Sequence, residues 1–337
     1  MKTRTTFFMA AFLFTAVSLW PQVAVDGKLP GKFTINANGD QVYFSQGNLQ
    51  YQAINKDGGS TWRFAEKQTT FLDRGPNKAI SETNTGWIDL FGWGTANNPT
   101  NASTDNADYS TTFSEWGDNA ISNGGNKTEM WRTLKAEEWM YIFHERAKAD
   151  ELVGFGTIGY SKGVILLPDD WQAPVNSAGI PLPFYSVKDK NFSWLTTYYY
   201  NSAKDNYSHN DNYSDEEWGA MEAAGAVFLP VTGLRIGTEM DYVNNTGGYH
   251  SATLKDDTHA YCVSFSQTNL HPNSYGSLYS GYAVRLVQDC DKGQVTAIDE
   301  VESQKREVES PQKVLCNGQL LIIHNGKTFN ALGAEVK

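Results

Sequence analysis

Residues 131–143, WRTLKAEEWMYIF, form the clearest helical pattern in the chain and decide its fold class. Thr133 is a good N-cap residue, and Glu137 and Glu138 then fall in the first turn, where the helix dipole favours carboxylates. One stripe of the segment 133–149 carries the side chains that would face a core, namely Leu134, Trp139, Ile142, Phe143 and Arg146. The pattern predicts an amphipathic helix capped by Thr133.

The residues on both sides of this helix read as short strands separated by polar loops, the longest over 96–126. Asn-Gly within NANGD (Asn36–Asp40) predicts a hairpin between KFTI and QVYFSQ. A second helix is expected after Ser214, which forms a capping box with Glu217, and Gly225 would end it. The other strand candidates are NLQYQ (48–52), TWRFAE (61–66), GVILLP (163–168), AVFLP (226–230), AYCVSF (260–265) and YAVRLV (282–287).

Strands and helices do not alternate along the chain as they do in a doubly wound sheet. We therefore expect an α+β fold with two helices, many short strands and long loops. Of the 337 residues, 13% are aromatic and 19% are charged, which indicates a globular protein with a weakly charged surface of the extracellular type. The formal net charge of −11 disfavours nucleic-acid binding, because phosphate backbones are anionic.

Both ends of the chain carry features of an exported protein. Residues 1–24 are expected to form a signal peptide, because Lys2 and Arg4 precede an apolar run that is too short to span a membrane. No other segment is apolar for long enough to cross a bilayer. Residues 25–290 would form the folded domain, 291–311 a polar linker, and 312–337 a small β tail. The alternative for the tail is a last hairpin docked on the domain.

Several stretches, taken in order, resemble known families. The helix sequence above, with AVFLPVTGLRIGT (226–238), GYHSAT (248–253) and YAVRLV, resembles C-type-lectin-like domains of the sulfatase-modifying-factor type. VYFSQGNLQYQ, TWRFAE, GWIDLFGWGT and GVILLPDDW are similar to the major paralogous domain of Fibrobacter and Bacteroides-group surface proteins. The resemblance implies a C-type-lectin-like fold over about 33–287 and specifies no activity, because folds host many functions.

The end of the chain resembles the short sorting tails that the type IX secretion machinery of Bacteroidota reads. The residues that match are Asn325, Gly326, Lys327, Gly333 and Lys337. This resemblance implies that the secretion machinery is a partner. It also implies that the protein is secreted or displayed on the outer cell surface, with the periplasm as the alternative.

Catalytic motifs are weak in this sequence. GFGTIG (154–159) matches G-x-G-x-x-G but does not open a helix after a strand, so we expect a loop and no dinucleotide site. Oxidases related to the resembled fold use a close cysteine pair, which Cys262 and Cys290 do not reproduce. If strands 260–265 and 282–287 pair as a hairpin, the two cysteines lie about 16 Å apart, which is too far for a disulfide. No disulfide is expected.

The segment 205–217, DNYSHNDNYSDEE, offers oxygen ligands that suit calcium, with Asp205 and Asp211 as the candidates. The preferred interpretation is a solvated loop that leads into the cap of the second helix. No other cofactor is expected.

We expect a secreted or cell-surface protein that binds or adheres without catalysis, with a glycan, a host protein or an envelope protein as ligand. Loops 232–253 and 267–280 would carry the ligand. The candidate contacts are Arg235, Tyr249, His250, Trp171 and Trp194, since aromatic faces stack on sugar rings. Two alternatives remain: a secreted enzyme whose site the sequence does not reveal, and a structural component of the envelope.

Overall fold

The structure is a computed structural model that describes residues 26–188, 198–199, 212–266, 269–290, 312–316, 319–324 and 327–330. The chain forms two compact units, Met1–Cys290 and Asp291–Lys337. The expected signal peptide and linker lie outside the described residues. Within the described part of the chain, no helix is long and apolar enough to cross a membrane.

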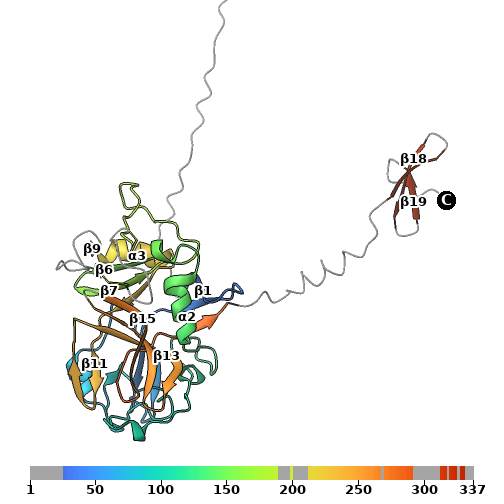
Figure 1. The fold of residues 1–337 in the computed structure, drawn as a ribbon. Helices are drawn as coiled ribbons and strands as arrows, with labels where there is room; N and C mark the ends of the chain where they lie inside the picture. The colour runs from blue at the N-terminus through green and yellow to red at the C-terminus, as the bar shows by residue number, and fades with distance from the viewer. Residues whose placement is uncertain are drawn as a thin grey trace, which may run out of the picture. The chain divides into compact units, whose positions relative to one another are not determined.

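The first unit is mostly β, with several small sheets and a few short helices (Figure 1). Neighbouring strands are antiparallel, except that β6 and β9 are parallel. Three of the sheets, in spatial order, are β1 (Lys28–Thr34), β2 (Gln41–Ser45), β16 (Val287–Asp289); β4 (Thr61–Phe64), β3 (Leu49–Gln52), β5 (Trp87–Ile88); and β10 (Val227–Pro230), β7 (Ser161–Leu166), β6 (Val153–Ile158), β9 (Asn212–Tyr213). The others are β11 (Leu234–Ile236), β12 (Glu239–Asp241); and β13 (Gly247–Asp256), β14 (His259–Phe265), β15 (Asn269–Ser277), β8 (Tyr198–Tyr199).

Short helices connect and cover these sheets. They are α1 (Arg74–Lys78), α2 (Ala136–Met140), α3 (Asp215–Ala223), η1 (Asn106–Asp108), η2 (Trp116–Asp118), η3 (Tyr141–Glu145) and η4 (Ala149–Glu151). In Figure 1, α3 lies beside β6 and β7 at one end of the unit, while β11 and β13 lie at the other end. This mixed architecture confirms the α+β class that the sequence predicts.

Residues 282–287 run through the core of the first unit and bind main chain from several sheets. Val284 and Leu286 are fully buried. The sequence predicts a core strand here, but only its end continues into the regular strand β16, because successive residues pair with different segments. The main-chain hydrogen-bond partners of the segment are Ser45, Leu49, Phe91, Arg132, Gly248 and His250.

Arg285 joins these segments from inside the core. Its guanidinium donates to the main-chain oxygens of Ser45 and Phe228 and to Oε1 of Gln68, and its side chain is only 1% exposed. Within the described residues Arg285 forms no ion pair. Gln68 lies between Arg285 and Glu222: its Oε1 accepts from Arg285, and its Nε2 donates to the carboxylate of Glu222. Burial lowers the pKa of Arg285 to about 10, so the group still carries its charge at neutral pH.

Two local predictions are confirmed at the level of single hydrogen bonds. Asn36 Oδ1 accepts from the main-chain N–H groups of Asn38 and Asp40, which closes the predicted hairpin between β1 and β2. Ser214 and Glu217 cap each other's main-chain N–H groups at the start of α3, as a capping box requires.

The helix predicted after Thr133 begins later than expected. Lys135 occupies the N-cap of α2, and its N–H donates to Glu138 at 2.8 Å. Thr133 instead donates its hydroxyl to Glu115 at 2.7 Å, so a tertiary contact replaces the predicted local cap. The predicted core face is confirmed, since Trp139 and Ile142 are fully buried.

Two further predictions are wrong. Residues 154–158 lie in β6 (Val153–Ile158) and not in a loop, and only Gly159 is in a turn. Neighbouring chain packs closely on the strand: a Cβ at Gly154 would lie 2.8 Å from the main-chain oxygen of Tyr185. The segment 260–265 pairs with β13 and β15 and not with 282–287. The two cysteines therefore do not have the register on which the distance of about 16 Å was based, and Cys262 and Cys290 are free thiols.

The second unit contains a three-stranded antiparallel sheet of β17 (Gln312–Cys316), β18 (Gln319–His324) and β19 (Lys327–Asn330). His324 pairs with Lys327, which starts β19. The other residues of the sorting-tail resemblance, Asn325, Gly326, Gly333 and Lys337, lie outside the described residues.

Replacing Arg285 with Met retains most of the side-chain volume and removes the guanidinium. The carbonyl groups of Ser45 and Phe228 then lose a buried donor, so we expect the free energy of unfolding to fall by about 3 kcal/mol, measured by urea denaturation. Lys67→Met is the control, because its 3.8 Å ion pair is exposed and contributes at most about 1 kcal/mol. Equal losses in the two variants would contradict this role of Arg285.

Candidate functional site

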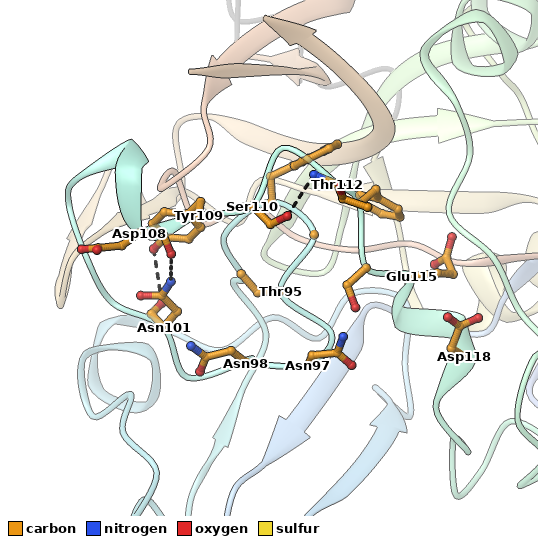
Figure 2. A pocket seen from close by; sticks show the side chains of 14 residues that line it. Thr95, Asn97, Asn98, Asn101, Asp108, Tyr109, Ser110, Thr112, Glu115 and Asp118 are labelled. Carbon is orange, nitrogen blue, oxygen red and sulfur yellow. Dashed lines mark hydrogen bonds between the residues drawn. The ribbon is translucent and has the colours of Figure 1, made fainter. Parts of the chain in front are cut away.

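A cleft of about 540 Å³ is lined by residues from the segment 93–118 of the first unit. Cavities of this size hold small molecules in many proteins. Its lining combines amides and hydroxyls, carboxylates, and aromatic rings. In Figure 2, Asn101 and Asp108 lie at one end of the cleft, Glu115 and Asp118 at the other, and Asn97 between them.

The loop that forms the cleft takes its shape from its own short polar side chains. Four of them accept a hydrogen bond from the main-chain N–H two residues on, which is the bond that Asn, Asp and Ser form in turns. The pairs are Asn101 with Ser103, Ser103 with Asp105, Asp105 with Ala107, and Ser110 with Thr112. The composition that marks this segment as a loop therefore also gives it a defined conformation.

Aromatic side chains form the inner wall of the cleft. Trp93 is 1% exposed, and its Nε1 donates to the main-chain oxygen of Ser251 at 2.9 Å. Tyr109 is also buried and donates to the main-chain oxygen of Ser103 at 3.0 Å. Phe113 is half-buried with its centroid 5.0 Å from that of Trp93, so it is the lining ring that keeps an accessible surface.

Arg235 supports the cleft from behind. Its side chain is fully buried, and its guanidinium donates to the main-chain oxygens of Leu90, Gly237 and Asn101. Asn101 lines the cleft, so Arg235 positions the wall without reaching the open space. The structure thus places Arg235, which was predicted to contact a ligand, behind the wall of the cleft.

The end of the cleft near α2 is held by Glu115. Its carboxylate accepts from the N–H and hydroxyl of Thr133, at 2.9 and 2.7 Å, and from the N–H of Gly117 at 3.1 Å. A Cβ at Gly117 would lie 1.8 Å from the main-chain oxygen of Trp131, so only glycine fits there. These contacts fix the position of the neighbouring Asp118.

Among the exposed side chains of the lining, the amides of Asn97 and Asn98 and the carboxylate of Asp118 are available to a ligand. Within the described part of the chain, none of them has a side-chain hydrogen bond or an ion pair. Amide groups both donate and accept, and a carboxylate accepts. The cleft can therefore bind hydroxyl and amino groups of a ligand while Phe113 contacts an apolar face.

Two other sequence-predicted contacts are core residues. Tyr249 is fully buried, donates to the main-chain oxygen of Pro230 at 3.1 Å and accepts from Asn48 at 3.2 Å. His250 is 3% exposed, and its Nε2 lies 2.7 Å from the main-chain oxygen of Phe91. They alternate along β13 within the packed interior, so neither side chain is presented to a ligand at the surface.

The remaining predicted contacts divide between the core and the undescribed part of the chain. Trp171 is half-buried and packs against the cluster beneath α3, away from the residues that line the cleft. Trp194, Asp205 and Asp211 lie outside the described residues. Among the residues that are described, no group of three His, Cys, Asp or Glu side chains could hold a metal ion.

A second, shallower hollow of about 380 Å³ lies where the sequence predicts the ligand loops. Residues 232–253 and 267–280 are largely the strands β11, β12, β13 and β15, so the prediction of irregular loops is wrong. Tyr242, Ser264, Asn269 and His271 are among the residues that line this hollow. It is polar, but it lacks the aromatic inner wall and the carboxylates of the larger cleft.

Two buried titratable groups lie next to the segment that forms the cleft. Asp89 accepts from Asn77 Nδ2 at 2.8 Å and from the N–H of Leu72 at 2.6 Å, and burial raises its pKa to about 7. Burial lowers the pKa of His250 to about 4. Both groups are therefore held in the neutral form over part of the acidic range.

These two groups predict opposite pH dependences of stability. Between pH 3.8 and about 7, Asp89 keeps its proton in the folded state and loses it in the unfolded chain. Its contribution to the free energy of unfolding therefore falls as pH rises. Between pH about 4 and 6.5, the imidazole of His250 is neutral in the folded state and protonated in the unfolded chain. Its contribution to the free energy of unfolding therefore falls as pH drops. Each slope is about 1.4 kcal/mol per pH unit, so the two cancel between about pH 4 and 6.5.

Single variants separate the two slopes. In Asp89→Asn, the free energy of unfolding should rise with pH from 4 to 6.5, and in His250→Gln it should fall over the same range, relative to the wild type. Urea denaturation at a series of pH values measures both slopes. Parallel profiles in all three proteins would show that neither group is held neutral.

The sequence predicts a loop over 96–126, but the cleft that residues 93–118 line was not predicted. The available signal was the run of Asn, Asp, Ser and Thr at two-residue spacing between aromatic residues 93, 109 and 113. No protein-family model matches this chain, and neither a curated protein nor a solved structure is similar enough to count as a match.

Proposed function

We propose that this chain is a secreted or cell-surface binding protein that holds a hydroxyl-rich ligand of the sugar class in the cleft of residues 93–118. We further propose, on the sequence resemblances, a C-type-lectin-like fold of the major paralogous domain type and a tail read by a type IX secretion machinery. The observation that carries the binding proposal is the set of unpartnered polar groups at a partly aromatic cleft.

The chemistry of the lining suits a sugar. Sugar hydroxyls donate and accept hydrogen bonds, and the free amides of Asn97 and Asn98 do both. Carbons on one face of a pyranose ring form an apolar surface that packs on an aromatic ring, and Phe113 offers an accessible ring. The walls are fixed by Arg235 and Glu115, so little ordering is needed on binding.

The two alternatives from the sequence lead to different observations. A secreted enzyme would convert a bound sugar, and a structural component of the envelope would associate with itself or with the envelope without a small ligand. Product analysis after incubation with each bound sugar tests the first, and the oligomeric state of purified protein tests the second.

Removing the free amides should weaken binding. We expect Asn97→Ala with Asn98→Ala to reduce affinity for a bound neutral oligosaccharide about tenfold, because two hydrogen bonds are lost. Isothermal titration against a panel of neutral oligosaccharides measures this. Asn38→Ala, an exposed asparagine outside the cleft, is the matched control. Wild-type binding to no member of the panel, or equal affinity in both variants, would contradict the proposal.

The tail proposal predicts where the mature protein ends. If the tail is an address that is removed, protein in the medium or at the cell surface should end before about residue 311. Cell fractionation with mass determination of the C-terminus in each fraction measures this. Periplasmic protein that ends at Lys337 would contradict the sorting role and favour an envelope component.

A further inference from the structure

The lining of the cleft carries negative charge without compensation. Asp108, Glu115 and Asp118 line it, whereas no Lys, Arg or His does. Within the described part of the chain, none of the three carboxylates takes part in an ion pair. The open space therefore has carboxylate side chains at both ends, as Figure 2 shows.

Two arginines adjoin residues that contact the lining, Arg132 next to Thr133 and Arg235 at Asn101, and both are engaged elsewhere. Arg132 donates to both carboxylate oxygens of Glu138 and to Asp289, at 2.8 to 2.9 Å. Arg235 is buried behind the wall and donates to main-chain oxygens. Neither guanidinium lines the cleft, so a bound anion would meet only carboxylates and neutral groups.

The three carboxylates differ in what they offer a ligand. Asp108 accepts from the hydroxyl of Ser103 at 2.5 Å, and both oxygens of Glu115 are hydrogen-bonded to the protein. Asp118 is exposed and has no side-chain partner among the described residues. Asp118 is therefore the carboxylate that is open to a ligand cation, and the turn around Gly117 fixes where it lies.

Building on the proposed function, we infer that the cleft selects sugars that carry a protonated amino group over neutral or anionic sugars of the same ring and linkage. The ammonium group binds Asp118, and the free amides of Asn97 and Asn98 bind ring hydroxyls. The sugar ring binds in the aromatic-walled cleft. Among the sugars that fit this cleft, the carboxylates favour those with a positive charge.

A matched series of ligands tests this inference. Tetrasaccharides with the same β-1,4 backbone of glucosamine, glucose or N-acetylglucosamine differ chiefly at C2, as ammonium, hydroxyl or acetamide. Each is titrated by calorimetry into the full chain at about pH 6, in low and in high salt. We expect glucosamine to bind about fivefold more tightly than glucose, as for one solvent-exposed ion pair, and the preference to decrease in high salt.

Variants assign the preference to one residue. Asp118→Asn keeps the side-chain shape and should remove the preference, so that glucosamine and glucose bind this variant with equal affinity. Asp57→Asn, an exposed carboxylate outside the cleft, is the control and should retain the preference.

The outcomes separate this inference from the proposed function. Equal binding of all three sugars, with loss of affinity in the Asn97 and Asn98 variant, would overturn the inference and leave the proposed function standing. A preference that persists in Asp118→Asn would overturn the role of Asp118. No binding of any sugar would overturn both.

Discussion

The first unit depends on a buried guanidinium that forms no ion pair within the part of the chain that the structure describes. A charge in this position requires strong acceptors, and Arg285 finds them in the carbonyl groups of β2 and β10 and in the amide of Gln68. Ser45 lies 240 residues from Arg285 in sequence, so one side chain fixes the relative positions of the first and last parts of the unit. The main chain of residues 282–287 adds hydrogen bonds to several other segments. The small sheets are therefore joined by the hydrogen bonds of Arg285 and of residues 282–287, and not by long runs of strand pairing between sheets.

The cleft shows the same arrangement on a smaller scale. Arg235, also buried, binds three carbonyl groups and holds the wall at Asn101, while Glu115 holds the opposite end through Thr133. Between these anchors, the loop is shaped by side-chain contacts to its own main chain. The frame consists of Arg235 behind the cleft and of lining residues such as Glu115 whose polar groups are already hydrogen-bonded to the protein. Binding groups such as Asn97 carry little of the structure.

The sequence predicted those features that neighbouring residues determine. The hairpin at Asn36–Asp40 and the cap at Ser214 follow from contacts within four residues, and both are confirmed. The start of α2 could not be predicted, because Thr133 is bound by Glu115, 18 residues away. Arg235, Tyr249 and His250 were predicted as ligand contacts because they lie in the predicted ligand loop 232–253, yet each is buried and binds a main-chain oxygen inside the core. The cleft lay in a segment that composition identified only as a loop.

The position of Arg285 near the C-terminal end of the first unit has a consequence for the order of folding. During synthesis the ribosome releases the N-terminal part first, and domains generally fold as units. Until residues 282–289 have emerged, β2 lacks its partner β16, and the carbonyl groups of Ser45 and Phe228 lack their donor. The nascent chain cannot complete its core before almost the whole unit has been translated. If the chain is exported as proposed above, this delay would keep it unfolded until it has crossed the membrane.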